Sequence, residues 1–237
     1  MADPIPAAAG IAANLRDVRR RIAAAARRAG RDPEGVRLVG VGKTVPAERI
    51  REAIEAGLTD LGENRVQEAR DKAGRLPAGV RWHLVGHLQG NKAAHAARLF
   101  HVVHSIDSAD LLRRLDQAAG REGRSIEALV QADLAREPTK HGAPEEALEG
   151  ILEAAAGCAA VAVRGLMILP PYDPDPENSR PFFRRLRGIL EDAARRHPRL
   201  GLAELSMGMS EDFEVAIEEG ATLVRVGRAL FGDRPSR

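Results

Sequence analysis

The sequence predicts an α/β fold, a closed (β/α)8 barrel of the TIM type. Eight short runs rich in β-branched and leucine residues alternate with longer amphipathic stretches that carry charges. The runs and their connections occupy about 190 residues, roughly 24 per unit, which is enough for one strand and one crossover helix. An open doubly wound sheet is the alternative. The first strand is not followed by Gly-x-Gly-x-x-Gly, the usual motif of a dinucleotide-binding sheet, and this favours the closed barrel.

An additional helix is expected before the barrel, over residues 7–29. Apolar residues recur there at spacings of three and four, at Ile11, Leu15, Val18 and Ile22. Gly30 follows and is a typical helix stop. The helix after the eighth strand is nearly absent, so we expect the N-terminal helix to fill the gap in the outer ring.

The predicted strands are short, and each is bounded by Gly, Asp, Asn or Pro, which are typical of turns. They cover residues 36–41, 58–61, 81–85, 102–106, 126–131, 163–168, 203–206 and 222–226. Helical patterns cover residues 46–56, 66–74, 92–99, 109–119, 144–156, 179–196 and 212–219. We expect one domain over 1–237, with the barrel between about residues 36 and 232.

Charges are numerous but nearly balanced, with 36 Lys and Arg against 34 Asp and Glu. The arginines alternate with acids, so the clustered positive surface that nucleic-acid binding requires is not expected. The longest uncharged apolar run, 154–163, is about half of the roughly 20 residues that span a membrane. The first residues also lack the positive segment of a secretory signal. We therefore expect a cytoplasmic protein with neither a nucleic-acid nor a membrane partner.

Lys43 is the strongest candidate for a residue that reacts with a ligand. In a barrel of this type the active site lies at the carboxyl ends of the strands, and Lys43 follows the first strand, close to Gly40 and Gly42. A lysine in a barrel mouth is partly desolvated, which lowers its pKa and allows its amine to form a Schiff base. A solvated loop lysine that caps the next helix is the alternative, and position alone does not decide between them.

Two loops that favour anions follow strands seven and eight, where such barrels commonly bind phosphate. Segment 207–212 runs from strand seven into a helix and offers backbone N–H groups and the Ser210 hydroxyl. Ser210 can equally serve as the N-cap of that helix. Gly227 allows a second close backbone approach, and Arg228 begins another short turn. A phosphate site opposite a lysine that forms Schiff bases implies pyridoxal 5′-phosphate (PLP).

The motifs at these strand ends resemble those of the pyridoxal phosphate homeostasis proteins, whose single-domain barrel is similar to the N-terminal half of alanine racemase. The similarity extends over nearly the whole chain, from about residue 38 to residue 232. Matching blocks occur in the family's order at 41–44 (Val-Gly-Lys-Thr), 62–68 (Gly-Glu-Asn-Arg-Val-Gln-Glu), 82–92, 140–142 (Lys-His-Gly), 164–167, 207–212 and 225–227. Several blocks in order are far more specific than any one of them.

The resemblance implies PLP as the cofactor and assigns roles around it. Lys43 would form the Schiff base, and Ser210 would hold the phosphate together with the backbone amides of Gly227 and Arg228. Arg225 would face the pyridine nitrogen. Because a guanidinium stays protonated, it cannot pass a full proton to the ring, so the cofactor would be a poor electron sink.

Two further residues, Asn64 and His83, match family positions that line the pocket, and Met209 would pack beside the ring. His83 is also explained as a core histidine on an alternating strand, and Met209 as a residue that fills the core. The sequence departs from the family pattern at Gly42, where Ser often precedes the lysine, and at Arg65, where an aromatic residue is frequent. Neither change removes a named contact, but both leave the hydrogen bonding around the ring open.

The resemblance implies a monomeric binding protein that stores, protects or hands over PLP without robust catalysis, with apo forms of PLP enzymes as candidate acceptors. A racemase-like enzyme is one alternative. It needs a second base, and the only tyrosine, Tyr172, lies in the proline-rich loop after strand six, so at most weak racemisation is expected. A lyase or aldolase that uses Lys43 on a sugar phosphate without a cofactor is the other, with Glu63, His83 and Asp212 as available acids or bases.

Overall fold

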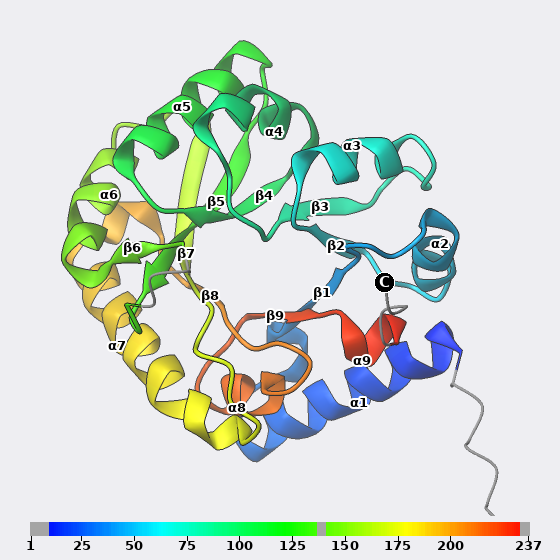
Figure 1. Cartoon of the computed structure of the whole chain (residues 1–237). Helices are drawn as coiled ribbons and strands as arrows, with labels where there is room; N and C mark the ends of the chain where they lie inside the picture. Colours follow the sequence, from blue (N-terminus) through cyan, green and yellow to red (C-terminus); the bar gives the residue numbers. More distant parts are fainter. Residues whose placement is uncertain (1–9, 137–140, 233–237) are drawn as a thin grey trace, which may run out of the picture.

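The computed structural model describes residues 10–136 and 141–232, and a closed ring of eight parallel strands forms its centre (Figure 1). The strands of the ring are β1 (Arg37–Val41), β2 (Asp60–Glu63), β3 (Arg81–Leu84), β4 (Val102–Ile106), β5 (Ile126–Asp133), β7 (Val161–Ile168), β8 (Glu204–Ser206) and β9 (Leu223–Val226). Their order is β4-β3-β2-β1-β9-β8-β7-β5, and pairing of β4 with β5 closes the ring. The predicted (β/α)8 barrel is confirmed, and the open sheet is excluded.

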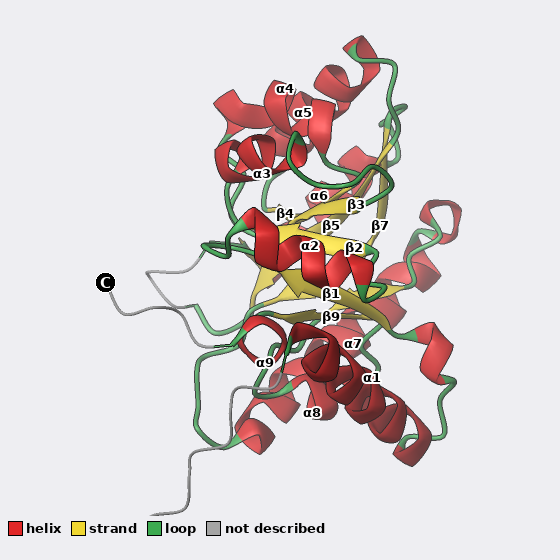
Figure 2. Ribbon diagram, turned by 90° about the vertical axis from the view of Figure 1, so that its right-hand side faces the viewer, coloured by secondary structure: helices red, strands yellow, loops and turns green. Residues whose placement is uncertain are grey.

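Helices cover the outside of the ring, as Figure 2 shows. They are α1 (Ile11–Arg28), α2 (Ala47–Glu55), α3 (Val66–Ala73), α4 (Ala93–Leu99), α5 (Ala109–Arg121), α6 (Leu148–Ala155), α7 (Arg180–Arg196), α8 (Phe213–Glu218) and α9 (Arg228–Phe231). Short 3-10 turns cover Pro33–Gly35, Gly90–Lys92, Glu145–Ala147, Pro176–Ser179 and Pro198–Leu200. Among the described residues, no helix combines the length and the apolar character needed to cross a membrane.

The N-terminal helix α1 completes the outer ring next to α9, which has only four residues. The helix contacts α2, α8 and α9, and its apolar face is buried. Asn14 donates a hydrogen bond to the Leu230 carbonyl oxygen at 3.0 Å, and Arg21 pairs with both carboxylate oxygens of Glu214 at 2.7 and 2.9 Å. The expected gap-filling position of this helix is confirmed for the part that the structure describes; residues 7–9 of the predicted helix lie outside it.

Most predicted boundaries lie within one or two residues of the observed ones, and two of the differences have a clear physical reason. Strand β2 begins at Asp60 and not at residue 58, because Leu58 belongs to the end of α2: its N–H donates to the Ala53 carbonyl oxygen, after Gly57 at φ +99°. The predicted helix over 144–156 begins only at Leu148. Pro144 instead lies in a two-residue strand, β6 (Ala143–Pro144), which pairs with β5 at an edge, where a proline without an N–H is tolerated.

Aliphatic side chains fill the space between the sheet and the helices, whereas the interior of the ring is partly polar. A small apolar cluster that includes Val39, Val41 and Met167 lies apart from the main core. Beside it are buried polar side chains, and a hydrogen bond between His104 of β4 and Ser206 of β8 joins two strands that are not neighbours. Such a bond has to cross the ring.

Close packing of β7 against β8 gives a test of the barrel. A Cβ atom at Gly165 would lie 1.8 Å from the Glu204 carbonyl oxygen, whereas one at Gly188, within α7, meets nothing within 4 Å. We expect Gly165→Ala to lower the free energy of unfolding by about 1–3 kcal/mol, because backbone must move. Gly188→Ala should raise it by about 0.5–1 kcal/mol, because alanine is the better helix former. Urea denaturation of both variants measures these values, and an unchanged stability of Gly165→Ala would contradict the strand packing.

Candidate functional site

A cavity of about 240 Å³ opens at the carboxyl ends of the strands. Ligand pockets commonly measure about 300–1,000 Å³, so this cavity suits a small ligand. The loops after β1, β2 and β8, together with β9 and its following turn, contribute to its wall. Seven of the eight residues predicted for the site line it: Lys43, Asn64, Met209, Ser210, Arg225, Gly227 and Arg228. The structure therefore brings the predicted residues together from distant parts of the chain.

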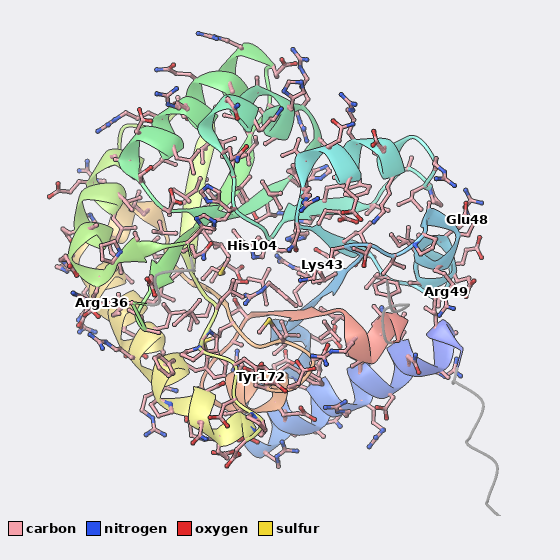
Figure 3. The ribbon with its side chains drawn as sticks, viewed as in Figure 1. Lys43, Glu48, Arg49, His104, Arg136 and Tyr172 are labelled. Carbon is pink, nitrogen blue, oxygen red and sulfur yellow. The ribbon has the colours of Figure 1, made fainter. Side chains whose placement is uncertain are left out.

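Lys43 is half-buried and lies toward the centre of the ring in Figure 3. The next residue, Thr44, has φ +65°, a left-handed conformation that β-branched residues rarely adopt and that costs about 1–3 kcal/mol. The Thr44 N–H donates to Glu68 Oε1 at 2.6 Å. This charge-assisted bond holds the strained turn that directly follows Lys43.

A buried ammonium group holds the other side of the same turn. Lys72 Nζ donates to the Gly42 carbonyl oxygen at 2.7 Å, to Glu63 Oε1 at 2.8 Å and to Glu68 Oε1 at 2.7 Å. These three bonds use every donor that an ammonium has. The carbonyl before Lys43 and the amide after it are therefore tied to one ionic cluster, formed by Glu63, Glu68 and Lys72. Sequence reasoning missed Glu68 and Lys72, although their spacing of four on a predicted helix is a signal for an ion pair.

Glu63 is the buried member of this cluster. Its side chain has no exposed surface, and its Oε2 atom has no hydrogen-bond partner among the described residues. Burial raises the pKa of Glu63 to about 7, although Lys72 opposes the shift. Gly42 leaves the room for this carboxylate, because a Cβ there would lie 3.0 Å from Glu63 Oε1 and 2.9 Å from the Ile50 side chain. The departure from the family pattern at Gly42 is thus matched to its surroundings.

At the opposite side of the cavity, two backbone N–H groups converge on one oxygen atom. The N–H groups of Gly227 and Ala229 donate to Ser210 Oγ at 3.3 and 3.2 Å. Ser210 is not the N-cap of α8; Asp212 occupies that position, and its carboxylate accepts the Met209 N–H at 2.6 Å. The loops after β8 and β9 are therefore joined through Ser210, and the two N–H groups of the turn after β9 converge on a place that suits an anionic oxygen.

The charges around the cavity favour an anion. Lys43, Arg225 and Arg228 supply three cationic groups, against the single carboxylate of Glu211, which pairs with Arg228 at 2.6 Å. Aliphatic and aromatic side chains cover the remaining wall: Val41, Val45, Val85, Leu169, Tyr172 and Phe231. Tyr172, which is 75% exposed, lies on the loop between β7 and α7. Its position at the cavity is not predicted by the sequence.

His83 is the one predicted residue that does not line the cavity. It is fully buried within the ring, where its Nε2 lies 2.9 Å from Asp60 Oδ1 and its Nδ1 lies 2.9 Å from His104 Nε2. Burial lowers the pKa of His83, although Asp60 opposes the shift. The His83 side chain is thus held between Asp60 and His104, and its place beside a bound cofactor stays a prediction.

Lys140, in the predicted block 140–142, lies outside the described residues. The adjacent His141 stacks on His87 with ring centroids 3.8 Å apart, beside a second cavity that shares Asn64 with the first. No group of three or more His, Cys, Asp or Glu side chains in 10–136 and 141–232 is arranged to bind a metal ion.

Comparison with known proteins agrees with this geometry. The family described as the N-terminal domain of alanine racemase matches residues 13–235. The pyridoxal phosphate homeostasis protein of Aquifex aeolicus is 42% identical over 221 residues, which cover 93% of this chain and 96% of that protein. The protein of the same name from Pseudomonas aeruginosa is 41% identical and covers 94% and 96%.

A solved structure gives the same result. PipY of Synechococcus elongatus PCC7942, determined without PLP, has a TM-score of 0.85 and 39% identity, and the match covers 94% of this chain and 100% of PipY. The structure of PipY with PLP bound has a TM-score of 0.83, with the same identity and coverage. The chain therefore belongs to the family of pyridoxal phosphate homeostasis proteins, which shares the alanine racemase N-terminal domain.

Proposed function

We propose that this protein binds PLP in the cavity at the mouth of the barrel and serves PLP homeostasis inside the cell as a carrier without robust catalysis. One observation carries the proposal: a half-buried lysine lines the same small cavity as Ser210, on which two backbone N–H donors converge. The names of the relatives, and a PipY structure that contains PLP, support it.

The residues present fit this cofactor. PLP supplies an aldehyde that condenses with a primary amine, and a phosphate that carries negative charge. Lys43 offers the amine, held in place through Gly42 and Thr44 by the ionic cluster. Ser210 and the N–H groups of Gly227 and Ala229 offer the donors for the phosphate. The apolar wall, with Met209, would contact the ring and exclude water from it.

Arg225 supports a carrier and not a carbanion-forming enzyme. Its Nη1 donates to Ser206 Oγ at 2.6 Å and its Nη2 to the Ile168 carbonyl oxygen at 2.8 Å. Burial lowers the pKa of Arg225 to about 10, which still leaves the group protonated at neutral pH. Facing the pyridine nitrogen, Arg225 would donate a hydrogen bond but retain its proton, so electron withdrawal into the ring would be weak.

The surroundings of the candidate acids and bases disfavour a cofactor-free aldolase. None of Glu63, His83 and Asp212 is among the residues that line the cavity. Glu63 bonds to Lys72, His83 to Asp60, and Asp212 to the Met209 amide. Each is engaged away from Lys43, so a sugar phosphate bound there would lack a general acid or base from this set.

We also infer a monomer that passes its cofactor to apo forms of PLP enzymes. Among the described residues, Tyr172 is the one large apolar side chain that is exposed, so no extended apolar patch favours a stable dimer. Because Tyr172 also borders the cavity, an apolar group of an acceptor protein can reach the cofactor entrance there.

The covalent role of Lys43 has a direct test. We expect purified protein incubated with PLP to be yellow, and borohydride reduction to fix the chromophore to Lys43, as located by peptide mass spectrometry. Lys43→Ala should lose the covalent absorbance yet retain phosphate-dependent binding, because Ser210 and Gly227 remain. Lys92→Ala, at an exposed lysine away from this cavity, is the control. A colourless wild-type protein that borohydride instead attaches to a sugar phosphate would favour the aldolase.

Racemisation tests whether the protein is a carrier. We expect PLP-loaded protein to form D-alanine from L-alanine no faster than Lys43→Ala does, because Tyr172 is mostly exposed and not held as a base. Chiral chromatography of the products measures this rate. D-alanine formation that disappears in both Lys43→Ala and Tyr172→Phe would establish a two-base racemase and contradict the carrier proposal.

The buried Glu63 predicts a pH dependence of stability. Its pKa is raised from 4.5 to about 7 in the folded protein, so folding favours the protonated form. The stability that Glu63 contributes is fully present below pH about 4.5 and is lost as the pH rises through about 7. Relative to Glu63→Gln, the unfolding free energy of the wild type should therefore fall by about 2–3 kcal/mol over this range. Denaturation at several pH values measures it, with the exposed Glu55→Gln as control; parallel curves for the wild type and Glu63→Gln would refute the shift.

A further inference from the structure

A continuous chain of hydrogen bonds crosses the interior of the barrel and ends on Arg225. Asp60 Oδ1 lies 2.9 Å from His83 Nε2, and His83 Nδ1 lies 2.9 Å from His104 Nε2. His104 Nδ1 lies 2.8 Å from Ser206 Oγ, which accepts from Arg225 Nη1 at 2.6 Å. We call this set the Asp60–Arg225 chain. It links the beginning of β2 with the wall of the proposed PLP cavity.

The position of these side chains is unusual for a barrel. Interiors of (β/α)8 barrels are filled mainly by branched aliphatic residues, because a buried polar group costs free energy unless it is hydrogen-bonded. His83, His104 and Ser206 have no exposed surface, and Arg225 is 4% exposed. Simple packing would be achieved by leucine or valine. The polar residues are therefore better explained by what they do to Arg225.

The chemistry of its two end residues, Asp60 and Arg225, determines where each proton of the Asp60–Arg225 chain lies. An ionised Asp60 only accepts, so His83 must carry its hydrogen on Nε2 and present a lone pair at Nδ1. His104 must then donate from Nε2 and accept at Nδ1 from the Ser206 hydroxyl. Ser206 Oγ is left with a lone pair for Arg225, which only donates. All the hydrogen bonds therefore run in one direction, from Arg225 to Asp60.

The electrostatic surroundings agree with this assignment. Burial alone would raise the pKa of Asp60, but hydrogen bonds from His83 and Thr59 hold it below the ordinary value. Burial lowers the pKa of His83 and lowers that of His104 well below its ordinary value, and the positive charge of Arg225 adds to the shift at His104. Two neutral histidines between a carboxylate and a guanidinium are the result.

Within the described residues, no carboxylate lies at salt-bridge distance from Arg225. The negative charge of Asp212 favours the charged form of Arg225, but only from a greater distance. The hydroxyl that accepts from Arg225 is polarised through the two imidazoles by Asp60, because hydrogen bonds in a row strengthen one another. The chain thus supplies part of the counter-charge that a buried guanidinium otherwise lacks.

We propose that Asp60, His83, His104 and Ser206 are positioning residues that hold the Arg225 guanidinium toward the cofactor ring and transmit the negative charge of Asp60 to it. The part of the proposal that concerns the pyridine ring of PLP rests on the proposed function. The proton arrangement does not, because it is a property of the protein without cofactor.

The proton arrangement is tested in full-length protein without PLP. Long-range 1H–15N correlation spectra of histidine side chains distinguish the two neutral tautomers from the doubly protonated ring. At pH 7 we expect His83 and His104 to be neutral with hydrogen on Nε2. Hydrogen on Nδ1, or a doubly protonated ring, at either residue would overturn the proposal. The resonances are assigned from His83→Gln and His104→Gln.

Two variants distinguish the residue that sets the direction of the hydrogen bonds from the residue that anchors Arg225. Asp60→Asn introduces an amide that can also donate, so we expect the Nδ1-protonated tautomer to appear at His83 and His104. Ser206→Ala should keep the wild-type tautomers, since Asp60 still sets them, but Arg225 loses its anchor. Unchanged tautomers in Asp60→Asn would show that Asp60 does not set the direction, and would overturn that part of the proposal.

The effect on the ring is measured in the PLP-loaded proteins. Asp60→Asn and Ser206→Ala should both shift the absorption maximum of the bound cofactor, and Ser206→Thr, which keeps the hydroxyl, should restore the wild-type band. Ser108→Ala is the control, because it removes the N-cap hydrogen bond of α5 and not a member of the chain. An absorption maximum identical to that of the wild type in both Asp60→Asn and Ser206→Ala would overturn the positioning role. If the wild-type protein does not bind PLP, the proposed function fails while the tautomer result stands.

Discussion

The pairing of β1 with β9 is the constraint on which the proposed site depends. In its register Val39 lies beside Arg225 and Gly40 beside Val226, so the ends of the two strands, far apart in sequence, meet at one edge. Lys43 follows one strand, and Gly227 and Arg228 follow the other. Packing of β1 against the Leu58 and Leu230 side chains needs a small residue at position 40, where a Cβ would lie 2.6 Å from the first and 3.1 Å from the second. Closure of the ring thus brings an amine and an anion site together.

Two polar systems hold the two ends of the cavity. The Glu63, Glu68 and Lys72 cluster fixes the strained turn around Lys43 from outside the ring. The Asp60–Arg225 chain fixes Arg225 from inside it. Both bury charged or polar groups, which aliphatic residues would replace at lower cost if packing alone mattered. Because both systems lie next to the cavity, we connect them with the binding of PLP.

Much of the fold and most of the proposed site could be predicted from local patterns. Periodic apolar residues indicated the helices, and glycines with polar residues after each strand indicated the mouth of the barrel. The prediction failed where one signal serves two structures: Leu58 is apolar because it packs at a helix end, and not because it begins a strand. Pro144 precedes the 3-10 turn that leads into α6, but it is itself part of an edge strand, which the sequence does not indicate.

The internal polar residues were beyond sequence reasoning for a different reason. His104 and Ser206 are separated by about 100 residues, and each alone resembles an ordinary core or strand residue. Their hydrogen bond can be recognised only in the folded barrel, which brings the two side chains together. For His83 the sequence left two explanations, a family position at the pocket and a core histidine, and only the structure shows its bonds to Asp60 and His104.

A crystal structure of the protein grown with PLP tests the central claim most directly. The account predicts continuous electron density between Lys43 Nζ and the cofactor, with the phosphate against the N–H groups of Gly227 and Ala229. A cofactor bound elsewhere, or a Lys43 side chain directed into solvent beside an empty cavity, would contradict it.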